Sequence, residues 1–199
     1  MMSACSPASA AFRASRSFMA LLCHKEADVP TPHDGAQAPP VESREPEPAA
    51  PAAVSLREIT AETVRQVCML EVSESQRVFV APNAISIAQA YFEPRAWFRA
   101  VYAGEEPVGF AMLEVDLVKH SYYLWRFMID HRYQGRGFGK QALALVIEHV
   151  RTLPEATALE LSYHAGPGEP APFYARLGFE ETGRIEEGER VMRLALLPA

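Results

Sequence analysis

The chain has 199 residues, of which 49% are hydrophobic and 22% charged, and it carries a formal net charge of −6. This composition is typical of a globular protein, and the length suffices for one domain with a substantial core. The acidic balance argues against a general nucleic-acid binder, which would carry a basic surface. The apolar runs are too short to predict a membrane span. The three widely spaced cysteines are typical of reduced thiols in a cytoplasmic protein.

Two different compositions divide the chain into residues 1–53 and 54–199. The first 25 residues contain Arg13, Arg16 and Lys25 but no acidic residue. This pattern is shared by organellar transit peptides and by upstream extensions of little structural meaning, and the second interpretation is favoured. The following stretch is rich in Pro and Ala and has almost no large apolar residue. It cannot bury enough surface to offset the entropy of ordering. We expect a disordered N-terminal extension, with folded structure beginning near Val54.

From Val54 onwards, segments with helical and strand-like patterns follow one another. Their order indicates an α+β fold with a mixed sheet. The predicted elements are a strand (54–59), two helices (61–72 and 83–93, the second capped by Asn83), a hairpin (97–103 and 107–117), a strand (121–129), a glycine-rich turn, a helix ending near 151, a strand (158–164), a short helix (170–178) and a final hairpin (179–185 and 189–197).

The turn "QGRGFGK" (134–140) lies between an apolar strand and an amphipathic helix. Backbone N–H groups at a helix start lack intrahelical partners, and glycines let a ligand approach them, so such a turn can bind phosphate. A P-loop would require Ser or Thr where Gln141 stands. In a dinucleotide-binding fingerprint the third glycine would come one residue after Gly139. A tight turn without a ligand is the alternative.

The string Gln134-x-x-Gly137-x-Gly139 in this context resembles the pyrophosphate loop of the GNAT N-acetyltransferase superfamily, and "FYARLGF" (173–179) resembles that family's Tyr-x-x-x-Gly-Phe ending. The resemblance extends over most of residues 54–199. It implies a GNAT-type acyl-CoA N-acyltransferase fold, a mixed and mostly antiparallel sheet flanked by helices. Within the superfamily, "LEVSESQRVFV" (70–80) and residues 125–143 are most similar to bacterial polyamine (spermine/spermidine) acetyltransferases.

The resemblance implies transfer of an acetyl group from acetyl-CoA, as co-substrate, to a primary amine, with no metal. Tyr174 would be the general acid that protonates the departing thiolate. The pantetheine arm would pair with the backbone of Phe127, Met128 and Ile129. The pyrophosphate would be held by backbone N–H groups of the turn, from Gln134, Gly135, Arg136, Gly137, Phe138, Gly139 and Lys140.

Two positions depart from the family pattern. Trp125 stands where the polyamine-acetylating relatives carry an acidic residue, so the general base is unassigned. Glu114 is the favoured candidate, with Asp130 and Glu74 as alternatives, and an ordinary solvated carboxylate remains an open interpretation for each. In addition, Pro167 stands where many members have an asparagine that contacts the cofactor.

The expected acceptor is a small-molecule amine, with a polyamine as the candidate, and neither nucleic acid nor membrane is expected as a partner. Glu71, Glu74 and Glu93 would form an acidic mouth for a polycation, or are simply solvated. One alternative is a protein or peptide N-acetyltransferase. Another is a non-catalytic acyl-CoA-binding sensor, an interpretation that Trp125 keeps open. Since many members of the superfamily are dimers, a homodimer is a further expectation.

Overall fold

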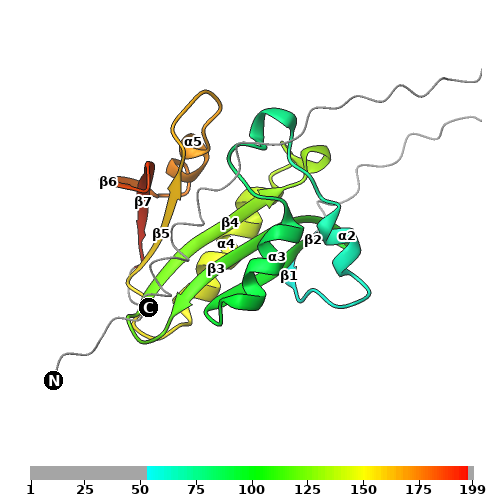
Figure 1. Cartoon of the computed structure of the whole chain (residues 1–199), viewed down its shortest axis with the longest axis horizontal. Helices are drawn as coiled ribbons and strands as arrows, with labels where there is room; N and C mark the ends of the chain where they lie inside the picture. The colour runs from blue at the N-terminus through cyan, green and yellow to red at the C-terminus, as the bar shows by residue number, and fades with distance from the viewer. Residues whose placement is uncertain (1–52, 197–199) are drawn as a thin grey trace, which may run out of the picture.

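The computed structural model describes residues 53–196, so the expectations for residues 1–52 lie outside its described part (Figure 1). The elements follow the predicted order, and the predicted α+β class is confirmed. They are β1 (Val54–Arg57), α2 (Val64–Cys68), α3 (Asn83–Phe92), β2 (Ala96–Ala103), β3 (Glu106–Asp116), β4 (Ser121–Ile129), α4 (Phe138–Arg151), β5 (Ala158–Tyr163), α5 (Ala171–Ala175), β6 (Glu180–Glu186) and β7 (Glu189–Ala195), with 3₁₀ turns at Glu74–Gln76 and His131–Tyr133.

Within the described residues the strands form a seven-stranded sheet in the order β1-β2-β3-β4-β5-β7-β6. Neighbouring strands are antiparallel except β4 and β5, which run parallel and pair only at Tyr123 and Glu160. In Figure 1, β4 and β5 start close together and then diverge. The sheet is therefore open on the β5-facing edge of β4.

Helices cover both faces of the central strands, with α3 and α4 on opposite sides in Figure 1. On α4 the buried positions are Ala142, Leu143, Val146, Ile147 and Val150, which recur at helical spacing and pack on the sheet. On the other face, residues of β3 and β4 pack against the segment from α2 to α3. None of the helices in residues 53–196 has the length and apolar character needed to cross a bilayer.

The helix predicted at 61–72 and the predicted cap at Asn83 were wrong in detail. Helix α2 ends at Cys68. From Glu71 the backbone bonds to the loop that follows β4: its N–H donates to the Asp130 carboxylate and its carbonyl accepts from the backbone N–H of His131. Asn83 is the first residue of α3, after Pro82. Its side-chain amide donates to the carbonyl of Val67 at 2.8 Å, so it joins α3 to α2 rather than capping its own helix.

The buried carboxylate of Asp130 fixes the end of β4 against the segment that follows α2. It accepts hydrogen bonds from the backbone N–H of Glu71 at 3.0 Å and from the backbone and guanidinium of Arg132 at 2.8–3.0 Å. Burial opposes ionisation, but these bonds outweigh it and lower the pKa of Asp130 to about 2. Asp130 is thus a structural carboxylate rather than a free base.

We predict that Asp130→Asn lowers the free energy of unfolding at pH 7 by about 1–3 kcal/mol, because the amide cannot accept all of these bonds. The native pKa lies below the ordinary value, so the contribution of Asp130 is present above about pH 4 and is lost as pH falls towards 2. The difference in urea midpoint between wild type and variant should therefore shrink between pH 5 and pH 2.5.

Glu105→Gln is a suitable control, since the Glu105 side chain is 89% exposed in its pair with Arg57 and should barely affect the midpoint. A constant difference between wild type and Asp130→Asn at every pH would contradict the role assigned to the ionised carboxylate.

Candidate active site

The divergence of β4 from β5 opens a cavity of about 850 Å³. Its walls come from the second half of β4, the glycine turn with the start of α4, and α5 with the loop before it. Nine of the ten residues predicted to bind the acyl donor line it, as does Tyr174. The lining residues among the predicted set are Phe127, Met128, Ile129, Gln134, Gly135, Gly137, Phe138, Gly139 and Lys140.

The glycine turn has the conformation of an anion-binding loop. Gly135 and Gly137 have φ of +77° and +81°, values that other residues adopt only with strain, and a side chain at either would project into open space. Gly137 precedes the first residue of α4, so the first N–H groups of that helix lack intrahelical partners, and Gly137 to Lys140 line the cavity. At Gly139 a Cβ would lie 3.5 Å from Ile129 and Phe173, an ordinary van der Waals contact, so the space there would admit a methyl group.

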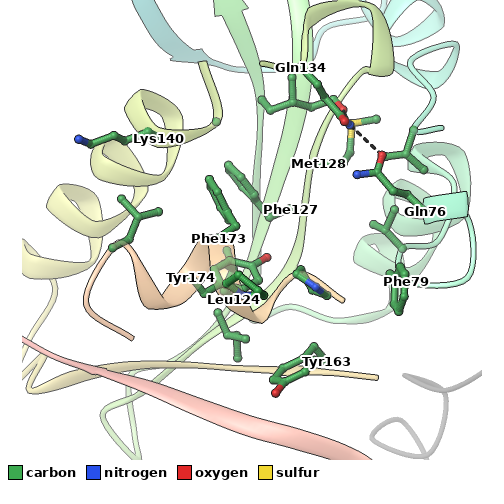
Figure 2. Close-up of a pocket in the computed structure, with 18 of the residues that line it drawn as sticks. Gln76, Phe79, Leu124, Phe127, Met128, Gln134, Lys140, Tyr163, Phe173 and Tyr174 are labelled. Carbon is green, nitrogen blue, oxygen red and sulfur yellow. Dashed lines mark hydrogen bonds between the residues drawn. The ribbon is translucent and has the colours of Figure 1, made fainter. Parts of the chain in front are cut away.

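The side chains of the turn have separate tasks. The amide of Gln134 donates to the carbonyl of Ile129 at 2.8 Å and to Gln76 at 2.9 Å (Figure 2). This link ties the turn to β4 and to the 3₁₀ turn before α3. Arg136 does not line the cavity and donates to the carbonyl of Arg132. Lys140 lies at the rim, with its side chain directed away from Tyr174 in Figure 2.

Tyr174 lies on α5 at the inner end of this cavity, beside Leu124 and Phe173 (Figure 2). Its ring packs edge-on against Phe173 and Phe179, with centroids 5.2 and 5.6 Å away. Burial, and to a lesser extent the nearby Tyr123, raise the pKa of Tyr174 well above its ordinary value. The phenol therefore keeps its proton throughout the neutral range and can donate it.

A β-bulge places Trp125 and Arg126 on the wall of the site. The register of β3 and β4 pairs Met112 with Arg126 but Leu113 with Leu124, so Trp125 is the extra residue on β4. After the bulge the side-chain alternation is reset, and both residues line the opening. The guanidinium of Arg126 donates to the Trp125 carbonyl at 2.8 Å and reaches Gln89 of α3 at 3.5 Å.

A second cavity, of about 740 Å³, shares this wall. Its other walls come from the segment between α2 and α3 and from the loop after β5. Apolar side chains such as Val72, Phe79 and Trp125 line it. The charged lining consists of two carboxylates, from Glu71 and Glu189, and two guanidiniums, from Arg77 and Arg126. The residues that line both cavities are Val72, Phe79, Val80, Trp125, Arg126, Met128, Ser162 and Tyr163. The two cavities therefore adjoin along a wall that β4 helps to form.

Glu114, the favoured candidate for the base, does not line either cavity. Its carboxylate lies 3.1 Å from Arg95, which also pairs with Glu93 at 2.9 Å and Asp116 at 3.0 Å. These bonds, from Glu93 first, raise the pKa of Arg95, so the guanidinium stays charged in the cluster. The position of Glu114 thus indicates a structural role, because its carboxylate is paired with Arg95 and lines neither cavity.

The other acidic candidates also have partners. Glu74 pairs with Arg77 at 3.0 Å on an exposed turn, and Glu71 pairs with the same guanidinium at 3.2 Å. Glu93 lies in the cluster around Arg95, so it is not part of an acidic mouth with Glu71 and Glu74. Within residues 53–196, no three His, Cys, Asp or Glu side chains are grouped to hold a metal ion.

Comparison with known proteins decides the family. The model of the acetyltransferase (GNAT) family matches residues 58–179. The chain belongs to this family. It is an acyltransferase whose acyl donor is acetyl-CoA, and the predicted family is confirmed. The spermine/spermidine N(1)-acetyltransferase of Bacillus subtilis is 29% identical over 150 residues, which cover 70% of this chain and 96% of that protein.

Solved structures share the fold of this GNAT protein. The spermidine N-acetyltransferase of Vibrio cholerae, solved with CoA and spermine, has a TM-score of 0.56 at 15% identity, covering 73% of this chain and 95% of that one. The ribosomal-protein-S18-alanine N-acetyltransferase of Escherichia coli has a TM-score of 0.54 at 19% identity, covering 71% of this chain and 93% of that one. At these identities the likeness concerns the fold alone.

The cavity fits the acyl donor in two respects. The glycine turn offers free N–H groups to a pyrophosphate, and the unpaired edge of β4 offers peptide groups to an amide-containing arm. Sequence reasoning missed two residues of the site. Gln76 tethers the glycine turn by accepting a hydrogen bond from Gln134. The ring of Phe173 stacks on that of Phe127, with ring centroids 6.1 Å apart. The only local signal for Phe173 is its place beside Tyr174.

We predict that Gly137→Ala weakens acetyl-CoA binding at least tenfold, as measured by calorimetry. The methyl group meets no protein atom closer than 4.0 Å, so the loss comes from strain at positive φ and from obstruction of the ligand. Gly183→Ala is a matched control, because Gly183 also has a positive φ of +76° and open space but lies on β6. The control should lose similar stability and bind normally; equal binding losses would contradict the phosphate role of the turn.

Proposed function

We propose that this GNAT enzyme acetylates a primary amine of a polyamine such as spermidine or spermine. The observation that carries the proposal is the second cavity, whose apolar lining includes the carboxylate of Glu189. Its other carboxylate, Glu71, pairs with Arg77 of the same lining, and Arg126 adds a second guanidinium. A polyamine alternates methylene segments with ammonium groups, which the apolar lining and the Glu189 carboxylate can complement. The name of the Bacillus subtilis relative supports the same substrate class.

Tyr174 and the residues predicted to bind acetyl-CoA each have a task in this proposal, whereas Glu114 has none. The N–H groups of residues 134–140 hold the pyrophosphate, and the open edge of Phe127, Met128 and Ile129 aligns the pantetheine arm. Acetyl-CoA supplies the acetyl group as a thioester. Tyr174 gives its proton to the sulfur as the thiolate leaves, and its raised pKa keeps that proton available. Trp125 and Met128 exclude water from the shared wall, which favours aminolysis over hydrolysis.

The substrate proposal is tested with the full chain by following CoA release with a thiol reagent. The panel consists of spermidine, spermine, simple diamines and short peptides with a free N-terminus or lysine. We expect kcat/KM for spermidine or spermine to exceed that for any peptide by at least tenfold. A preference for peptides would identify a protein or peptide acetyltransferase. Binding of acetyl-CoA without release in the presence of any acceptor would identify a sensor.

We predict that Tyr174→Phe lowers kcat about 100-fold or more while the Kd for acetyl-CoA stays within twofold, since the ring is kept and only the proton donor is lost. Because the pKa of Tyr174 is raised, the wild type should show no loss of rate from this group between pH 6 and pH 9.

Tyr122→Phe is the matched control. Its hydroxyl donates to the carbonyl of Pro154, in the core and outside both cavities, so the variant should keep its activity. An unchanged kcat in Tyr174→Phe would mean that another group protonates the thiolate.

A further inference from the structure

A directed chain of hydrogen bonds crosses the gap between β4 and β5. The hydroxyl of Tyr123 donates to the hydroxyl of Ser162, which donates to the carboxylate of Glu189. The other oxygen of Glu189 lies 3.1 Å from Nε2 of His164. Every donor therefore points towards the carboxylate, which is the arrangement needed to move a proton from β4 to β7.

The chain lies where the two substrates must meet. Tyr123, Ser162, His164 and Glu189 all line the second cavity, and Ser162 lines the first cavity as well. Tyr123 is also near enough to Tyr174 to contribute to the rise in its pKa.

The exposure of the two ends fits a route to solvent. The Glu189 side chain is only 13% exposed, whereas that of His164 is 41% exposed. A proton received by Glu189 can therefore leave through the imidazole to bulk water.

We propose that Tyr123, Ser162 and Glu189 form the proton acceptor of the reaction, in place of the carboxylate that Trp125 replaces. This inference rests on the proposed amine acetylation. As the acceptor ammonium loses a proton to the oxygen of Tyr123, the hydroxyl proton of Tyr123 moves to Ser162 and that of Ser162 moves to Glu189. The electron pair of the broken N–H bond stays on nitrogen and forms the bond to the acetyl carbon.

The protons of the proposed reaction balance. The nitrogen loses two protons between ammonium and amide. One leaves through Glu189 and His164 to solvent, and the second replaces the proton that Tyr174 gives to sulfur when the C–S bond breaks and its electron pair stays on sulfur. The products are the amide, CoA with a free thiol and one released proton.

No other carboxylate that was considered for the base has this position. Glu114 is held by Arg95, Asp130 is held by Arg132 and backbone N–H groups, and Glu74 lies on an exposed turn. Other charged groups also surround Glu189. On β6 its register partner is Glu186, which pairs with Arg184, and along β7 the next residue is Arg190. The cavity lining adds Glu71, Arg77 and Arg126.

The test is the rate of Glu189→Gln as a function of pH, with whichever amine of the panel the wild type acetylates fastest. At pH 7 we expect kcat to fall about 100-fold or more. Above pH 7 the free amine fraction grows about tenfold per pH unit until the pKa of the amine, near 10. The deficit should therefore shrink steadily towards pH 9.5, while the Kd for acetyl-CoA, measured by calorimetry, stays unchanged.

Two further variants make the outcome decisive. Ser162→Ala cuts the chain but leaves the carboxylate, and should show the same pH-dependent deficit. Glu181→Gln is the matched control, because Glu181 accepts a bond from Tyr163 next to Ser162 but has no part in the chain, so it should behave as wild type.

A Glu189→Gln variant with the wild-type rate and pH profile would overturn the inference, as would a deficit that is the same at every pH, which would indicate a merely structural role. If Glu189→Gln fails to fold, Ser162→Ala decides by the same criteria. An active wild type that prefers peptides contradicts the polyamine proposal alone. A wild type that binds acetyl-CoA but acetylates no amine contradicts both.

Discussion

The separation of β4 from β5 is the constraint on which the site depends. The two strands share one point of pairing, and the aromatic residues of α5 occupy the space beyond it. Closing the gap would add hydrogen bonds worth roughly 0.5–1.5 kcal/mol each. It would also expel rings such as Phe173 and Tyr174, whose burial is worth roughly 1.5–3 kcal/mol each. The packing of these rings therefore opposes closure, and the edge of β4 stays available.

The bulge at Trp125 has a second consequence for the same edge. A regular strand would send Trp125 and Arg126 to opposite faces, whereas the bulge brings both to the wall shared by the two cavities. At the wall shared by the two cavities the bulge thus presents the large ring of Trp125. In the relay that we propose, Tyr123 of β4 takes the proton and passes it through Ser162 of β5 to the Glu189 carboxylate on β7.

The acidic residues of this protein illustrate how partners decide roles. Glu93, Glu114 and Asp116 surround one arginine and hold the end of β3, and Asp130 holds the turn after β4. Glu189, in contrast, accepts a hydrogen bond from the hydroxyl of Ser162 and lies beside the imidazole of His164 at a cavity wall. Identical functional groups therefore serve stability in one place and, we propose, proton transfer in another.

Local patterns determined much of this protein. The order of helices and strands, the amphipathic helix after the glycine turn, and the positive φ at Gly135 and Gly137 all follow from periodicity and from the steric freedom of glycine. The motif around Tyr174 indicated the family. Only the tertiary structure decided which carboxylates are engaged, that Trp125 lies in a bulge, and that Ser162 and Glu189 meet. The contacts of Glu189 with Ser162 and of Arg95 with Glu114 and Asp116 join residues that are far apart in the sequence, so only register and strand order bring them together.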